Sequence, residues 1–185
     1  MTNYPMTKCG ARCALVIGIW TLILFPAQAT TFLTQQEALE KAFPGAEVTR
    51  RTVTLTDDQL KTAGKLAGSK IPSALVFVYE AARDGAVVGT AYFDVQRVHS
   101  LPQTLMLVVS RDGRLRSLDV LAFKEPPKFM APAAWLEQFP GRALDDSLQL
   151  RQDIQGISGA TLTARATTKS VRRVLAIHAV LQEGR

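Results

Sequence analysis

The stretch of sequence that best indicates the fold is residues 74–94, ALVFVYEAARDGAVVGTAYFD. Two apolar runs, rich in valine and aromatic residues, flank Arg83-Asp84-Gly85. Asp-Gly between two such runs is a strong signal for a β-hairpin, because both residues tolerate the left-handed backbone of a tight turn. We therefore expect two antiparallel strands, at 74–81 and 86–94.

The same pattern recurs immediately downstream. Apolar runs at 105–110 and 115–122 flank a second turn sequence, Arg111-Asp112-Gly113-Arg114. Two hairpins at similar spacing predict an antiparallel meander of at least four strands.

Two short helices and a further strand are expected before this meander. Thr34-Gln35-Gln36-Glu37 and Thr56-Asp57-Asp58-Gln59 both have the capping-box pattern that opens a helix. Pro44-Gly45 stops the first helix, Gly68 lies near the end of the second, and residues 47–55 between them alternate like a strand. The adjacent acids of the second helix are expected to be first-turn charges that suit the helix dipole, not a catalytic pair.

The clearest predicted helix occupies the last thirty residues. Apolar residues and one histidine recur there at steps of three and four: Val171, Val174, Leu175, His178 and Leu181. Lys169, Arg172 and Arg173 are expected to project largely elsewhere, as a solvated face or alternatively a binding patch. His178 is expected to be a half-buried packing residue and His99 a loop residue, so no metal site is predicted.

Together these elements predict an α+β fold, in which a few helices pack on a twisted antiparallel sheet and a long helix closes the chain. A short helix at 133–139 precedes that last helix. The length of 185 residues favours one domain. We assign residues 74–185 to its body and 30–73 to a helical and strand segment that packs on it.

The first 29 residues are predicted to be a secretory signal peptide. Lys8 and Arg12 precede an apolar run at 14–25, and Ala27-Gln28-Ala29 offers small residues for cleavage. An uncleaved anchor is the alternative, although the apolar run is short for a membrane span. The expected localisation is periplasmic or otherwise extracytoplasmic, either free or associated with the membrane. Cleavage would leave 156 residues with a net charge of +4.

Composition excludes several classes of function. The chain is 47% hydrophobic and 21% charged, as in an ordinary globular protein, and its net charge of +6 favours anionic partners such as phosphates or nucleotides. Its two cysteines, Cys9 and Cys13, would leave with the signal peptide. That excludes thiol catalysis, cysteine-ligated iron–sulfur clusters and C-x-x-C-H haem attachment from the mature chain. The basic residues are too dispersed to predict nucleic-acid binding.

A loop of small residues, Gly156-Ile157-Ser158-Gly159-Ala160-Thr161-Leu162-Thr163, leads into the last helix. Its glycines allow close backbone approach, and its hydroxyls and the free N–H groups of the first helical turn can hold a phosphate. Arg165 and Lys169 could supply countercharge. The loop is not a Walker A motif, which requires a Lys-Ser/Thr pair. The alternative is a capped loop whose small residues serve packing alone.

Ser158-Gly159-Ala160-Thr161-Leu162-Thr163 resembles the flavinylation motif of the FMN-binding domain family. That family includes the C subunit of sodium-translocating NADH:quinone reductase, the G subunit of the Rnf electron-transport complex and many exported flavoproteins. The similarity covers roughly residues 74–181. It includes the hairpins, Glu125-Pro126, a short tryptophan-bearing helix ending in Phe139-Pro140-Gly141, the loop itself and the closing helix.

The resemblance implies a specific cofactor chemistry. Thr161 would be joined to FMN by a phosphoester bond, made by a flavin transferase that cleaves FAD and passes its FMN moiety to the hydroxyl. The site residues expected from the loop are Ser158, Gly159, Ala160, Thr161, Leu162 and Thr163. Phe129, Trp135 and Leu162 are candidates to cover the flavin ring, with Glu125 as a polar contact. Phe129 and Trp135 could alternatively be ordinary core aromatics.

The chain departs from the family pattern at two positions. Gln155 stands where the family usually has aspartate, with Asp153 two residues further upstream, and Ala164 stands where serine is common. Neither change removes the acceptor hydroxyl. Reversible binding of FMN or another phosphate ligand, or a flavin-free assembly module of a membrane redox complex, is therefore the alternative to covalent attachment.

The function expected from this resemblance is that of an exported electron carrier. The sequence has no nicotinamide fingerprint, haem motif or catalytic triad, so we assign no catalytic residues and expect a redox carrier or subunit, not a stand-alone enzyme. Its electron partner would be a membrane reductase or a periplasmic cytochrome.

Overall fold

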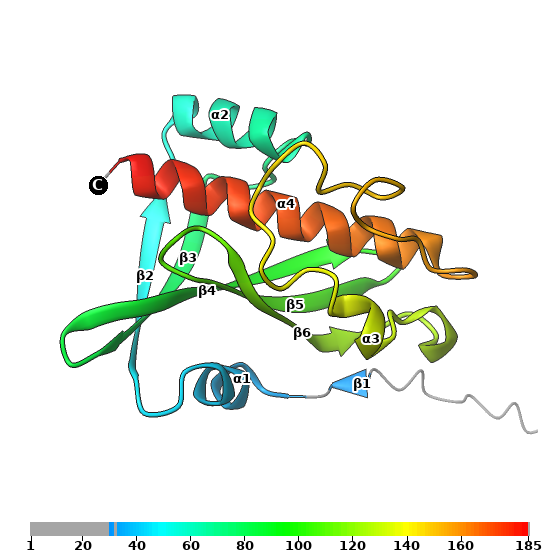
Figure 1. Ribbon diagram of the computed structural model, residues 1–185, viewed down its shortest axis with the longest axis horizontal. Coiled ribbons are helices and arrows are strands. Elements are labelled where there is room, and N and C mark those ends of the chain that lie inside the picture. Colours follow the sequence, from blue (N-terminus) through cyan, green and yellow to red (C-terminus); the bar gives the residue numbers. More distant parts are fainter. Residues whose placement is uncertain (1–29, 32, 185) are drawn as a thin grey trace, which may run out of the picture.

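The computed structural model describes residues 30–31 and 33–184 (Figure 1). The predicted signal peptide, residues 1–29, lies outside the described residues. Within them, no helix is both long and apolar enough to cross a membrane.

An antiparallel sheet of six strands forms the centre of the molecule, in the order β1-β6-β5-β4-β3-β2. The strands are β1 (Thr30–Thr31), β2 (Glu47–Thr54), β3 (Leu75–Arg83), β4 (Ala86–Arg97), β5 (Pro102–Val109) and β6 (Leu115–Phe123). Both predicted hairpins are present, as β3–β4 and β5–β6. The first turns through Asp84 and Gly85, whose φ angles of 52° and 76° are those of a tight left-handed turn.

Helices cover both faces of this sheet. Figure 1 shows α4 (Thr161–Glu183, orange to red) across one face with α2 (Asp57–Ala67) beside it, and α1 (Gln35–Ala42) on the opposite face. A one-turn 3₁₀ helix (Pro127–Phe129) and α3 (Ala133–Leu136) lie between β6 and α4. Both predicted capping boxes are formed, at Thr34 and at Thr56. The α+β prediction is thus confirmed.

The core has two parts because the sheet is covered on both sides. β5 lies between β6 and β4, so its alternate residues enter different layers. Leu105 and Leu107 pack toward α2 and α4, whereas Met106 and Val108 pack toward α1. This two-sided burial explains why β5 reads as an unbroken apolar run.

The prediction of a solvated basic face on α4 was wrong for two of its three residues. Arg172 and Arg173 are only 8% and 7% exposed. The Arg173 guanidinium bonds both carboxylate oxygens of Asp94 on β4, at 3.0 and 2.5 Å. The Arg172 guanidinium donates only to backbone carbonyl groups, those of Leu66, Ala67, Asp145 and Leu148. Arginines that looked peripheral on a helical wheel therefore fasten α4 to its neighbours.

His178 is more deeply buried than expected. It is 3% exposed, and its Nδ1 lies 2.9 Å from the hydroxyl of Tyr92 on β4. Burial lowers the pKa of His178 and raises that of Tyr92. His178 lies in the C-terminal half of α4, far along the helix from the Ser-Gly-Ala-Thr loop.

Candidate cofactor-binding site

The glycine of the Ser-Gly-Ala-Thr loop is required by the backbone. Gly159 has a φ of 76°, and a side chain built on it would meet no atom within 4 Å. The turn is closed by the Ala160 N–H, which donates to the Ile157 carbonyl at 3.2 Å. Left-handed conformation, not lack of space, therefore favours glycine here. The turn directs the chain into the first residue of α4.

The start of α4 has no side-chain cap. Its N-cap residue is Ala160, which offers no oxygen to the N–H groups of the first turn. The Thr161 side chain is exposed, and among the described residues its hydroxyl has no hydrogen-bond partner. A helix start with unsatisfied N–H groups beside a free hydroxyl is chemically suited to a phosphate.

A cavity of about 440 Å³ opens beside this helix start. Its apolar lining comes from Leu162, which is 43% exposed, and from Phe129 and Val98. Gly159, Ala160, Thr161 and Thr163 complete the loop side of the cavity. Apolar walls next to a phosphate-binding helix start suit a flat aromatic ring with a phosphate tail. The residues present therefore fit FMN.

Glu125 and His99 form the polar wall of this cavity. The Glu125 carboxylate accepts hydrogen bonds from the backbone N–H groups of His99, Ser100 and Leu101, at 3.2, 2.7 and 2.6 Å. These bonds, led by that from Leu101, lower the pKa of Glu125. Glu125 thus holds the β4–β5 loop against the cavity. His99 was missed as a site residue, because some sixty residues separate it from the motif and only the fold brings them together.

Two of the expected site residues, Trp135 and Ser158, do not line this cavity, and a third, Thr163, lines it with its hydroxyl already bonded. Trp135 is 8% exposed in the main core and stacks edge-on with Phe139, as its alternative interpretation anticipated. The Thr163 hydroxyl lines the cavity but donates to the Phe129 carbonyl at 2.5 Å, so that proton is not available to an anion. Ser158 is exposed at the turn and is not part of the cavity lining.

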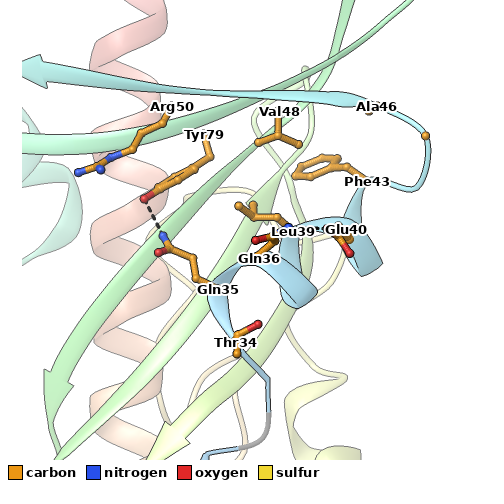
Figure 2. Close-up of a pocket in the computed structure, with 11 residues that line it drawn as sticks. Thr34, Gln35, Gln36, Leu39, Glu40, Phe43, Ala46, Val48, Arg50 and Tyr79 are labelled. Carbon is orange, nitrogen blue, oxygen red and sulfur yellow. Dashed lines mark hydrogen bonds between the residues drawn. The ribbon is translucent and has the colours of Figure 1, made fainter.

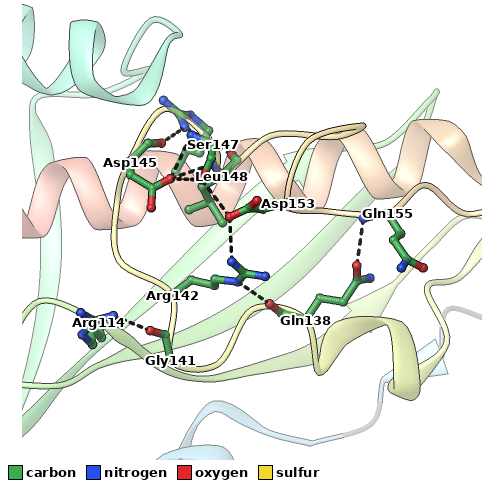
Figure 3. Close-up of polar contacts among 10 residues, drawn as sticks. Arg114, Gln138, Gly141, Arg142, Asp145, Ser147, Leu148, Asp153 and Gln155 are labelled. Carbon is green, nitrogen blue, oxygen red and sulfur yellow. Dashed lines mark hydrogen bonds and ion pairs between the residues drawn. The ribbon is translucent and has the colours of Figure 1, made fainter.

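Gln155, at the position where aspartate was expected, is fixed through its backbone. Its N–H donates to the Gln138 side chain at 2.9 Å, and its carbonyl accepts from the Trp135 indole N–H at 2.7 Å. Its side chain is exposed (Figure 3). Trp135 therefore contributes to the site indirectly, by holding the segment that leads into the loop.

Asp153 cannot replace the missing acid without breaking other contacts. Its carboxylate is 2.7 Å from the Arg142 guanidinium and accepts from the Ser147 hydroxyl at 2.8 Å (Figure 3). Asp145 also caps the Ser147 and Leu148 N–H groups, so residues 142–155 form a hydrogen-bonded loop. Asp153 is thus part of the loop's internal structure.

A larger cavity of about 670 Å³ lies elsewhere, between α1 and the β2–β3 edge of the sheet (Figure 2). Its lining includes Gln35, whose amide donates to the Tyr79 hydroxyl at 2.6 Å. It contains no residue of the 156–163 loop. The part of the chain that the structure describes also holds no cluster of side chains suited to a metal ion.

Comparisons with known proteins relate part of this chain to an FMN-binding domain. Residues 99–176 match the model of the FMN-binding domain. The chain is 26% identical over 160 residues to the G subunit of the Na⁺-translocating ferredoxin:NAD⁺ oxidoreductase complex of Acetobacterium woodii, covering 80% of this chain and 74% of that protein. Its fold resembles NqrC of Shewanella oneidensis, with a TM-score of 0.54, 15% identity, and coverage of 82% of this chain and 91% of the other. Residues 99–176 of this chain are therefore similar to the FMN-binding domain.

Proposed function

We propose that this protein is an exported electron carrier that holds FMN through a phosphoester bond to Thr161. The observation that carries the proposal is the uncapped start of α4, where an exposed threonine hydroxyl borders an apolar cavity. A tethered cofactor suits an extracytoplasmic protein, because FMN lost there would not readily be replaced. The signal peptide predicted at 1–29 supports that location.

FMN, when bound, supplies one- and two-electron redox chemistry. The protein residues would position it and control its surroundings. The first-turn N–H groups of α4 would hold the phosphate, Phe129 and Leu162 would exclude water from the ring, and Glu125 would keep the His99 side of the cavity in place. No described residue is assigned a catalytic role.

Attachment requires a partner enzyme, a flavin transferase that uses FAD. The Thr161 oxygen would replace the AMP oxygen on the phosphorus of the FMN half. The new bond is Oγ1–P, the diphosphate bond of FAD breaks, AMP leaves, and the hydroxyl proton is lost. This is a phosphoryl transfer without change of oxidation state.

The electron partner is proposed to be a membrane redox complex, with a periplasmic cytochrome as the alternative. The similarity to a subunit of a sodium-translocating oxidoreductase complex supports the first of these.

The test is to express the full chain with a flavin transferase and to measure the mass and in-gel fluorescence of the denatured protein. We expect one added FMN, lost in Thr161→Ala and retained in Thr161→Ser. Ser158→Ala, which removes another exposed hydroxyl of the loop, is the matched control and should keep the flavin. Covalent flavin in Thr161→Ala would overturn the assignment of the attachment site.

Reversible FMN binding is the second candidate, and Gln155 is the observation that favours it. The acid expected at this position is absent, and Asp153 is held by Arg142. If the transferase needs that acid, the unmodified chain should bind FMN that dialyses away on denaturation, and Gln155→Asp should become labelled. Equal labelling of both forms would show that the glutamine does not matter.

A further inference from the structure

A second cavity borders Thr161, with a lining unlike that of the first. It measures about 380 Å³ and lies between α4, the end of α2 and residues 149–151. None of its lining residues is acidic, and four of them are cationic: Arg151, Arg165, Lys169 and Arg172. Thr161 thus lies between an apolar cavity and this basic cavity.

The positive charge of the basic cavity is not neutralised by the protein. Arg165 and Lys169 follow Thr161 at successive steps of four, so all three lie on one face of α4. Within the described part of the chain, the exposed side chains of Arg151, Arg165 and Lys169 make no hydrogen bond or ion pair. The buried Arg172 guanidinium donates only to carbonyl oxygens, which leave its full charge in place.

The charges of α4 are not arranged as those of a helix whose charges serve stability. α1 and α2 have acidic residues in their first turns and a lysine in their last turns, which suits the helix dipole. The first turn of α4 has no acidic residue and its last turn has no basic one. From Thr161 to Gln182, every charged side chain is cationic. Helix stability therefore does not account for Arg165 and Lys169, whereas a partner of opposite charge does.

The third exposed cation, Arg151, is presented by an unusual backbone. Its φ of 68° lies in the left-handed region that favours glycine. The Arg151 N–H donates to the Ile154 carbonyl at 2.9 Å, and Leu150 forms a β-bridge with Ile154. Backbone contacts therefore close this turn and fix the point from which the Arg151 side chain reaches the cavity.

The shape of the basic cavity favours a partner protein over a lipid surface. The cations line a hollow, which protruding acidic side chains of a protein can enter and a planar membrane surface cannot. On the other side of Thr161, Leu162 is 43% exposed and adds an apolar contact. Apolar contacts bordered by charged ones are typical of protein interfaces, and complementary charge steers the short-lived encounters of redox proteins.

We propose that the basic cavity binds the acidic surface of the electron partner. The inference rests on the proposed function, which attaches the flavin to Thr161, because a partner seated on Arg151, Arg165 and Lys169 lies beside that flavin. A phosphoester at Thr161 carries a single negative charge, whereas four cations line the cavity. The cavity therefore keeps a net positive charge for the partner after FMN is attached.

Binding of a small acidic redox protein to the full chain tests this proposal, with flavodoxin as the probe. The chain is prepared with and without covalent FMN, and its affinity for flavodoxin is measured by calorimetry at low salt and at about 0.15 M salt. We expect flavodoxin to bind both forms, about tenfold more weakly at the higher salt. A carbodiimide should join the Lys169 amine to flavodoxin carboxylates, and mass spectrometry locates that bond.

Three double variants separate this surface from the overall charge of the chain. Arg165→Gln/Lys169→Gln should weaken flavodoxin binding about tenfold, whereas Arg165→Lys/Lys169→Arg keeps both charges and should stay within about twofold of the unmodified protein. Arg111→Gln/Lys61→Gln is the matched control, because it changes the net charge equally at two exposed positions outside the cavity. It should also bind within about twofold of the unmodified protein.

Several results would overturn the proposal. No flavodoxin binding, or equal losses in both glutamine variants, would mean that this surface does not select an acidic protein. Displacement of flavodoxin by inorganic phosphate at constant ionic strength would make the cavity a small-anion site. Binding of phosphatidylglycerol vesicles that depends on Arg165 and Lys169, without such dependence for flavodoxin, would assign the surface to a membrane. Flavodoxin binding to the flavin-free chain does not need Thr161 to be labelled, so failure of the proposed function would be seen separately.

Discussion

The first turn of α4 differs from its later turns in exposure and in side-chain hydrogen bonding. The helix starts at Thr161 without a side-chain cap, and Thr161 and Leu162 are exposed. Arg172, Arg173 and His178, in contrast, are buried and hydrogen-bonded. α1 and α2, by contrast, begin with complete capping boxes at Thr34 and Thr56. α4 is instead anchored three to five turns beyond its open start.

Breaking the ion pair that Arg173 of α4 makes with Asp94 should have the largest effect on the free energy of unfolding. Asp94→Ala leaves the buried Arg173 guanidinium without its carboxylate, which costs about 3–5 kcal/mol of unfolding free energy for a buried pair. Urea unfolding measures this. The control is Asp119→Ala, which breaks the exposed pair with Lys41 and should cost about 1 kcal/mol or less. Similar losses in both variants would mean that Arg173 does not anchor α4.

His178 should make the anchored part sensitive to pH. Burial lowers its pKa in the folded chain below the ordinary value of 6.5, so the unfolded chain binds the proton first as the pH falls. Stability should therefore decrease as the pH drops below about 6.5, by at most about 1.4 kcal/mol per pH unit, until the folded-state pKa is reached.

Urea midpoints between pH 8 and pH 5 check this dependence. His178→Gln keeps a polar group beside Tyr92 but cannot titrate, so this part of the pH dependence should disappear. His99→Gln removes the other histidine and should retain it. A pH profile unchanged by His178→Gln would contradict the argument.

Removing a cap from a structural helix should cost less. Thr56→Ala deletes the oxygen that accepts from the Gln59 N–H at 3.2 Å, at a cost of about 1 kcal/mol. Thermal and urea unfolding measure the loss, and FMN attachment by the folded protein should not change. Loss of flavin in this variant would show that the two helix starts are coupled.

Supplying a cap to α4 should have the smallest effect on stability. Ala160→Ser adds an oxygen that can accept from the first-turn N–H groups, and we expect a gain of about 0.5 kcal/mol in the flavin-free protein. Reversible FMN affinity should fall by about threefold, because the serine competes for the same N–H groups. Unchanged affinity in a stabilised Ala160→Ser protein would mean that those groups do not hold the phosphate.

Structural features were predicted correctly from the sequence where they depend on residues that are neighbours in the chain. Asp84-Gly85 predicted its turn and Thr56 its capping box because each depends on residues within a few positions. Arg172 and Arg173 could not be placed, because their partners lie on α2, β4 and a distant loop. The same reason explains His99, which reaches the motif only through the order of strands in the sheet.

The carbonyl-bound Arg172 has a consequence for acid resistance. An arginine keeps its charge at any pH that a protein encounters, and a backbone carbonyl has no proton to gain. The bonds that join α4 to α2 and to the 142–155 loop through Arg172 should therefore not depend on the protonation of any acidic side chain.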